Sequence, residues 1–320
     1  MRRIGLAVIF AVGLVGTPLI VGAQPTERLR VVGILLGRPE AARAFEEGLR
    51  EFGWVEGKTV RFERRIGTDY QRLSRDAVEL TRIPVDIIYA GSSPSTRAAV
   101  EATRTLPIIT MSADPVGAGF AASLARPGAN VTGIAIMNTE LSGKRLEILA
   151  QALPTARRIA LLANPANPAT PLMRRATEAR ASGIGVQILP FEASSPDRLA
   201  DVMTMAAQRR VDALVVLADP MFFSNRQRLL EAAVQHRLPA IWEWPEFAEA
   251  GGFMAYGPRV DDLHRHAAKY VDRVLRGAKP ADLPVEQATK FELVINMKAA
   301  KALGLTIPQT LLLRADQVIQ

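Results

Sequence analysis

Short apolar segments alternate with amphipathic, helix-like segments along most of this chain, and this alternation restricts the fold more than any other feature. In the first half, the runs interpreted as strands cover residues 31–36, 59–65, 85–90 and 107–111, and the helical patterns cover residues 41–52, 70–81 and 95–105. Strands and helices that alternate through short links are typical of parallel sheets with helices on both faces.

The second half repeats this order of elements without repeating the sequence. Its expected strands cover residues 158–163, 186–189, 212–217 and 239–242, and its expected helices include residues 140–152, 225–236 and 261–275. A chain of this length is near the upper limit for one hydrophobic core. We therefore predict an α/β protein with two Rossmann-like lobes, each built on a parallel sheet.

The end of the chain is expected to return to lobes that are already built. Residues 291–318 contain a strand-like run and a helical pattern, so several strands should cross between the lobes. The predicted first lobe comprises residues 24–136 plus approximately 258–284, and the second comprises residues 137–257 plus approximately 285–320.

Residues 1–23 have the pattern of a signal peptide. Arg2 and Arg3 precede an apolar run that ends in Val21, Gly22 and Ala23, which predicts cleavage near Ala23. A membrane anchor is the alternative, because the run approaches the minimum of about 18 residues that can span a bilayer. Its glycines, proline and small terminal residues favour cleavage, and the sequence leaves open whether export uses the general or the twin-arginine route.

Charge and cysteine content narrow the classes of partner and compartment. The formal net charge of +8 falls to +6 without the two signal-peptide arginines, and the basic residues are spread along helices among acidic ones. No recognition motif accompanies them, so nucleic acid is not an expected partner. The chain has no cysteine, which excludes disulfides, Cys-type zinc sites and a lipid anchor. We expect a free periplasmic monomer without stable membrane insertion.

Candidate ligand-binding residues follow the expected strands, because ligands of open parallel sheets bind outside the carboxyl ends of the strands. The candidates in the first lobe are Arg38, Gly91, Ser92, Ser93, Thr96, Ser112 and Asp114. Those in the second lobe are Asn164, Asp219, Trp242 and Tyr256.

The loop at residues 91–96 is the most specific of these candidate ligand-binding sites. A turn rich in glycine and hydroxyl groups leads into a helix, whose first N–H groups can hold a carboxylate or another anionic group. Ser93 or Ser95 acting as an N-cap explains the composition about as well. The two interpretations are compatible.

Two aspartates, one in each lobe, stand before a proline after a strand. Asp114 and Asp219 can take the ammonium or hydroxyl group of a small ligand, and the alternative is an Asp-Pro turn. Arg38 can pair with a carboxylate, although a solvated loop arginine is the expected description.

The aromatic residues near strand ends have two interpretations. They can stack on a ring of the ligand, but core packing is favoured by roughly two to one. These residues are Tyr89, Trp242, Trp244 and Tyr256.

Patterns of catalytic and metal-binding residues do not stand out. The sequence has no Gly-x-Gly-x-x-Gly, phosphate-binding loop or Gly-x-Ser-x-Gly motif, and its carboxylates form no distinctive pair. The three histidines, His236, His264 and His266, are expected at helix ends or on the surface. A metal or acid-base role is not expected for them, and a ligand carrier is favoured over an enzyme.

Five segments together resemble a known family: residues 112–117, 123–133, 250–258, 290–296 and 302–308. They are similar to ABC transporter substrate-binding proteins of the type that includes tryptophan and tyrosine binders. The resemblance implies a type I periplasmic-binding-protein fold, in which two lobes around a hinge enclose a small ligand. It also implies delivery of that ligand to a membrane permease with a cytoplasmic ATPase, without enzymatic activity or a cofactor.

By this resemblance, Ser92, Ser93, Ser112 and Asp114 match loops that face the cleft, and Asp219 lies in the corresponding region of the other lobe. Arg97 follows the 91–96 loop directly, and for this reason the specificity for aromatic amino acids is not transferred. Residues 128–130 replace the more usual double glycine, which should matter little.

The function expected from the sequence is capture of a small polar or amino-acid-like ligand by closure of the two lobes. The alternative is a periplasmic sensor that acts through a separate membrane receptor. An exported hydrolase is the least favoured class, because the chain lacks a nucleophile-base pattern.

Overall fold

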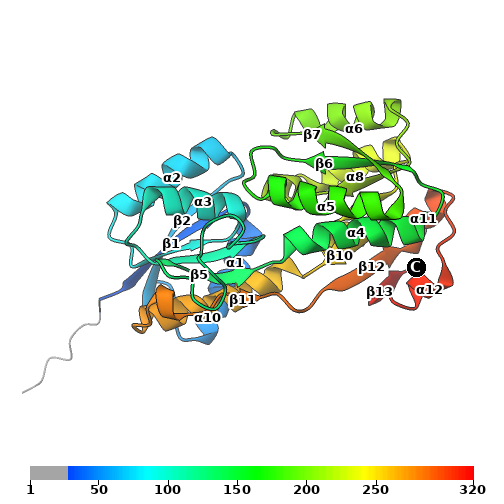
Figure 1. Ribbon diagram of the computed structural model, residues 1–320. Coiled ribbons are helices and arrows are strands. Elements are labelled where there is room, and N and C mark those ends of the chain that lie inside the picture. Colours follow the sequence, from blue (N-terminus) through cyan, green and yellow to red (C-terminus); the bar gives the residue numbers. More distant parts are fainter. Residues whose placement is uncertain (1–27) are drawn as a thin grey trace, which may run out of the picture.

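The computed structural model of the protein describes residues 28–320, arranged as two α/β lobes side by side (Figure 1). The predicted signal peptide and its cleavage site lie outside the described residues. In this part of the chain, no helix is both long enough and apolar enough to cross a membrane.

The first lobe contains a parallel sheet with the strand order β11-β5-β4-β3-β1-β2. Its strands are β1 (Arg30–Leu36), β2 (Val60–Ile66), β3 (Ile87–Ala90), β4 (Ile108–Ser112), β5 (Val131–Ala135) and β11 (Glu286–Gln287). Its helices are α1 (Pro39–Glu51), α2 (Tyr70–Arg82), α3 (Ser93–Ala102) and α10 (Val260–Leu275), with a 3-10 turn at Pro280–Asp282.

The second lobe contains a sheet with the strand order β13-β12-β10-β9-β8-β6-β7, in which β12 runs antiparallel to β10 and the other pairs are parallel. Its strands are β6 (Arg158–Ala163), β7 (Gln187–Glu192), β8 (Ala213–Val216), β9 (Ala240–Trp242), β10 (Met254–Gly257), β12 (Glu292–Asn296) and β13 (Gln317–Ile319). Its helices are α4 (Asn138–Ala152), α5 (Thr170–Ile184), α6 (Arg198–Gln208), α7 (Pro220–Ser224), α8 (Arg226–Gln235), α9 (Pro245–Glu249), α11 (Met297–Ala302) and α12 (Gln309–Leu312).

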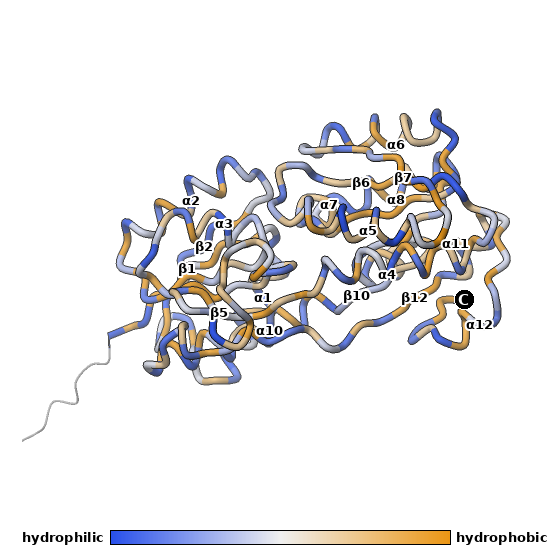
Figure 2. The backbone as a smooth tube through the Cα atoms, viewed as in Figure 1, coloured by the Kyte–Doolittle hydropathy of each residue, from blue (hydrophilic) through white to orange (hydrophobic). Residues whose placement is uncertain are grey.

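Burial in the sheets follows the sequence pattern. The tube in Figure 2 is mostly orange along the central strands and bluer on the outer helices. Helix α1 buries Phe45 and Leu49 on one face, as its periodicity predicts. That face packs on α10, and a Cβ added to Gly48 would lie 2.5 Å from the Arg265 carbonyl oxygen. The glycine thus allows a helix from late in the chain to complete the first lobe.

The chain passes between the lobes three times. The first passage joins β5 to α4 through Met137, whose backbone is left-handed with φ 68°. The second joins β10 to α10, and the third joins β11 to β12. The last passage lies later than the approximate boundary at 285, because β11 pairs with β5 and the Ala288 N–H donates to the Ala135 carbonyl.

Candidate ligand-binding site

A pocket lies between the lobes, where the carboxyl ends of strands from both sheets face each other. The cavity enclosed by its side chains has a volume of about 60 Å³. From the first lobe and the adjoining start of α4 it is lined by Leu36, Gly37, Arg38, Ala41, Gly91, Ser92, Ser93, Met111, Ala113, Ile136, Asn138, Val260 and His264. From the second lobe it is lined by Asn167, Ala169, Ala218, Asp219, Pro220, Phe223 and Trp244.

The amino end of α3 forms one wall of the pocket. The Ser92 side chain caps this helix by accepting from the Ser95 N–H at 3.1 Å, so this loop does hold an N-cap, but the capping residue is Ser92 and not Ser93 or Ser95. Ser93 accepts from the Ala113 N–H at 2.9 Å, which fixes α3 against the end of β4. The helix dipole therefore directs its positive end toward the pocket.

Arg38 contacts both lobes. Its guanidinium pairs with Asp261 of α10 and lies 4.4 Å from the centre of the Phe223 ring in the second lobe. With a side-chain exposure of 13%, Arg38 is not the solvated loop arginine that the sequence suggested. Asp261 balances its charge, and Phe223 covers one face of the guanidinium.

Asp219 is a buried carboxylate at the opposite wall. It caps α7 by accepting from the Met221 N–H at 2.9 Å, as expected for an Asp-Pro turn. Asn164 and Asn167 donate to it from within the second lobe, at 3.3 and 2.9 Å, and the Tyr70 hydroxyl donates to it from the first lobe at 2.7 Å. Burial raises the pKa of Asp219, and these four donors act against that rise.

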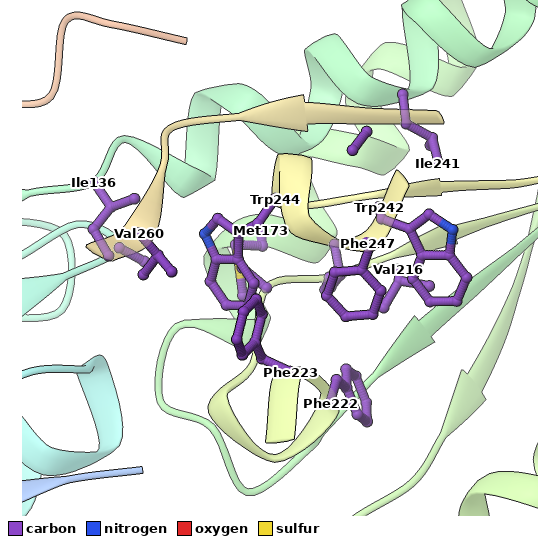
Figure 3. Close-up of a cluster of buried hydrophobic side chains, with 14 of the residues drawn as sticks. Ile136, Met173, Val216, Phe222, Phe223, Ile241, Trp242, Trp244, Phe247 and Val260 are labelled. Atoms are coloured by element: carbon purple, nitrogen blue, oxygen red, sulfur yellow. The ribbon is translucent and has the colours of Figure 1, made fainter. Parts of the chain in front are cut away.

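Trp244 contributes an indole N–H to the pocket. The residue is 5% exposed, and this N–H has no hydrogen-bond partner among residues 28–320. In Figure 3 the indole nitrogen is directed toward Ile136 and Val260, which line the pocket on the side of the first lobe. Phe223 packs edge-on against the ring at 5.0 Å. A buried donor without an acceptor is costly unless a bound molecule satisfies it.

His264 of α10 also faces the pocket, although the sequence suggested a helix-end or surface position. It is 3% exposed, and its Nδ1 lies 2.6 Å from the Tyr89 hydroxyl oxygen. Burial lowers the pKa of His264 to about 3, and the nearby Arg38 charge adds to this effect. The imidazole is therefore neutral at ordinary pH.

The two lobes are closed on each other in this structure. Besides the contacts from Tyr70 and Arg38, the Ser224 hydroxyl donates to the Gly37 carbonyl at 3.5 Å. A Cβ added to Gly37 would lie 3.0 Å from the Pro220 Cβ, so the two strand-end loops touch. The pocket is thus a space between lobes already in contact.

The candidate residues from the sequence fall into three groups. Those that line the pocket are Arg38, Gly91, Ser92, Ser93 and Asp219. Those buried behind its wall are Asn164, which supports Asp219, Thr96, which pairs with Thr110 at 2.6 Å, and Ser112. Those located elsewhere are Asp114, Trp242 and Tyr256.

Each residue in the last group has a structural contact that explains its position. Asp114 accepts from the Gly117 N–H at 2.8 Å, as expected for the turn that the sequence allowed. Trp242 stacks on Phe247 with ring centres 4.6 Å apart, in the core of the second lobe. The Tyr256 ring lies near Phe291, with ring centres 6.3 Å apart.

Several pocket residues were missed in the sequence. Asn138 and Asn167 lie just beyond strand ends and could have been found by inspecting those loops more widely. Phe223 and His264 lie on helices, and their approach to the pocket depends on how α7 and α10 pack. No local sequence signal marks these two.

Arg145 of α4 connects the passages between the lobes to the pocket wall. It is fully buried and donates to the Asn138 side-chain oxygen at 3.0 Å, the Tyr256 carbonyl at 2.7 Å and the Glu243 carbonyl at 3.1 Å. Asn138 follows the first passage and Tyr256 precedes the second. Burial raises the pKa of the Glu243 carboxyl to about 8.

The family is identified by comparison with known proteins. The family model for "ABC transporter substrate binding protein" matches residues 37–319, which is most of the chain. The chain belongs to the ABC transporter substrate-binding protein family. The structure has the type I periplasmic-binding-protein fold, as the sequence resemblance implied. Members of this family are solute-binding proteins rather than enzymes, and they bind small molecules outside the cytoplasm.

Individual relatives are distant but cover the chain well. A tyrosine-binding protein from Clostridioides difficile is 26% identical over 269 residues, covering 83% of this chain and 77% of the relative. A conserved domain protein from Vibrio cholerae has a TM-score of 0.84 at 26% identity, covering 91% of this chain and 99% of its own. An ABC domain in complex with L-Trp from Streptococcus pneumonia has a TM-score of 0.82 at 26% identity, covering 91% and 100%.

Proposed function

We propose that this protein is the ligand receptor of an ABC importer, which captures a small amino-acid-like molecule between its lobes and delivers it to a permease with a cytoplasmic ATPase. The observation that carries the proposal is the pocket shared by both lobes, with the unpartnered Trp244 N–H inside it. A ligand there touches both lobes at once.

Capture follows from this shared contact. A ligand that contacts α3 in the first lobe and Trp244 in the second binds the closed form better than the open form. It therefore shifts the equilibrium toward closure by the difference in binding free energy. The closed form is then the signal that the permease recognises.

The proposed ligand class draws on the relatives and on the pocket. One relative is named for tyrosine binding and another was solved with L-Trp, so an amino-acid-like ligand is the natural class. Apolar side chains dominate the lining, while the α3 amino end offers N–H groups to an anion.

The proposed setting is the periplasm. Cleavage near Ala23 would release a protein without a lipid anchor, since the chain has no cysteine. We propose that it acts as a monomer that contacts its ligand and the permease, and not nucleic acid.

The test is a ligand screen on the protein that begins at Gln24. Amino acids, small carboxylates, nucleosides and sugars are compared by thermal unfolding. A ligand present at one hundred times its dissociation constant should stabilise the folded state by about 2.7 kcal/mol. A saturable shift from one chemical class supports the proposal, and a folded protein that responds to no class contradicts it.

Tryptophan fluorescence locates the binding event. The chain has three tryptophans, of which Trp244 lines the pocket and Trp54 bonds to Asp272 far from it. A variant that keeps only Trp244 should change its emission on binding, whereas one that keeps only Trp54 should not. Uptake of the bound ligand into vesicles that contain the permease then distinguishes a transport receptor from a sensor.

A further inference from the structure

The pocket wall offers hydrogen-bond donors that have no acceptor within the described residues. Ser93 is the first residue of α3, and its backbone N–H has no intrahelical partner. Its hydroxyl oxygen accepts from Ala113, which leaves the hydroxyl proton free to donate. The Trp244 indole N–H is a third such donor, and it belongs to the opposite lobe.

The carboxylate on the same wall already accepts as many hydrogen bonds as it can. Asp219 is the one carboxylate that lines the pocket within residues 28–320, and a carboxylate has about four acceptor sites. All four are used, by Tyr70, Asn164, Asn167 and the Met221 N–H. No site on Asp219 remains for the ammonium group of a ligand.

Each of the two neutral amide oxygens of the wall has one donor, which leaves one lone pair on each oxygen. The Asn167 oxygen accepts from the Ala169 N–H at 3.0 Å, and the Asn138 oxygen accepts from Arg145 at 3.0 Å. An ammonium group carries three donors and a full charge, and burying it without a carboxylate or several acceptors is unfavourable. The wall therefore offers several free donors, whereas its one charged acceptor is filled and the acceptor sites that remain belong to neutral groups.

The fixed charges around the pocket largely balance. Arg38 lines it as a cation whose charge Asp261 balances, and Asp219 lines it as a carboxylate. The rest of the lining is mostly apolar, including Met111, Ile136 and Val260. The free donors and the apolar lining match a ligand with an acceptor-only group, such as a carboxylate, attached to an apolar body.

We propose that the ligand is a small carboxylic acid with an apolar body and without an α-ammonium group, held by the α3 amino end and by Trp244. This inference rests on the proposed function and narrows its ligand class. An α-amino acid would place a buried ammonium where every acceptor on Asp219 is taken.

The first test compares ligands that differ at one substituent. Phenylalanine, phenyllactate and 3-phenylpropanoate are titrated into the protein beginning at Gln24, together with tryptophan and indole-3-propanoate, by isothermal titration calorimetry. We expect the ammonium-free acids to bind tighter than their amino acids by roughly tenfold or more. Equal or tighter binding of the amino acids overturns the inference and leaves the proposed receptor function intact.

Binding of a nucleoside or sugar with no response to any carboxylate also overturns the inference while supporting the receptor function. A folded protein that binds no member of any class argues against both. Failure of the ligand inference can therefore be distinguished from failure of the proposed receptor function.

The second test removes one donor. Trp244→Phe keeps an aromatic ring and deletes the indole N–H, so affinity for the preferred acid should fall about tenfold or more. Trp242→Phe is a matched control, because Trp242 also has a buried N–H without a partner among the described residues, yet lies outside the pocket. Equal effects of the two substitutions overturn the role of Trp244.

Discussion

At the scale of single residues, the Tyr70 hydroxyl joins the two lobes through Asp219. Tyr70→Phe removes this bond and leaves a buried carboxylate with one donor fewer. Hydrogen bonds to charged groups contribute roughly 1.5–3 kcal/mol, so ligand affinity should fall about tenfold or more. The loss should appear as faster ligand dissociation in stopped-flow measurements, because the closed form is less stable.

Tyr256→Phe is the control for Tyr70→Phe. The Tyr256 side chain lies outside the pocket, near Phe291. This substitution should leave the dissociation rate unchanged. An unchanged rate in Tyr70→Phe as well would show that the Tyr70–Asp219 bond does not hold the lobes together.

Glu243 makes the stability of the protein depend on pH. Its folded pKa is raised by burial from 4.5 to about 8. A group of this kind contributes stability that is fully present below its unfolded pKa and is lost as the pH rises through its folded pKa. Between these two values the loss approaches about 1.4 kcal/mol per pH unit.

Glu243→Gln should remove this dependence, because glutamine resembles the protonated acid and does not titrate. The free energy of unfolding, measured by urea denaturation from about pH 5 to 8, should fall less steeply in the variant than in the unaltered protein. Glu246, whose pKa is also raised by burial, is present in both proteins and cancels in the difference. Parallel pH profiles would contradict the prediction.

Some site residues could be predicted from the sequence because their positions depend only on neighbouring residues in the chain. Ser92 and Asp219 directly follow strands and begin helices, so their place at the pocket follows from the sheet topology. His264 lies in the first turns of α10, and it reaches the pocket because α10 packs on α1. That contact joins segments far apart in the chain, and no local pattern records it.

At the scale of elements, a glycine explains why strand β5 was missed. The prediction for residues 158–163 matches β6, a continuous apolar run. Strand β5 was not predicted, since Thr132 and Gly133 interrupt its apolar pattern. Gly133 has φ 138°, and a Cβ there would lie 2.1 Å from the Thr110 carbonyl oxygen. The glycine is required by the close approach of β5 to β4.

Gly133→Ala should therefore destabilise the protein by about 3 kcal/mol, through both backbone strain and steric overlap. Gly183→Ala is the matched control, because Gly183 lies in α5 with no atom within 4 Å of an added Cβ. That change should raise the unfolding free energy by about 0.5–1 kcal/mol. Equal effects in chemical denaturation would contradict this account of β5.

At the scale of the whole molecule, closure can be trapped by a covalent bond. The chain has no cysteine, so Gly37→Cys combined with Pro220→Cys introduces one pair across the lobes. The corresponding Cβ atoms lie 3.0 Å apart, and a disulfide needs about 3.5–4.5 Å, which a slight parting of the lobes provides. The oxidised protein should neither take up nor release ligand.

Reduction should restore exchange in the double variant, and each single variant should exchange ligand under both conditions. Small-angle scattering should show an oxidised form that is compact with or without ligand. Free ligand exchange in the disulfide-bonded protein would mean that the pocket opens without separation of the lobes.

The three passages between the lobes also set an order in time. Helix α1 ends at Glu51, whereas α10, which covers it, begins at Val260, and β11 completes the same sheet later still. During synthesis the first lobe must wait for nearly the entire chain before its core can close. The first lobe of the nascent chain therefore stays without a complete core until late in synthesis, whereas most of the second lobe comes from one continuous segment, α4 to β10.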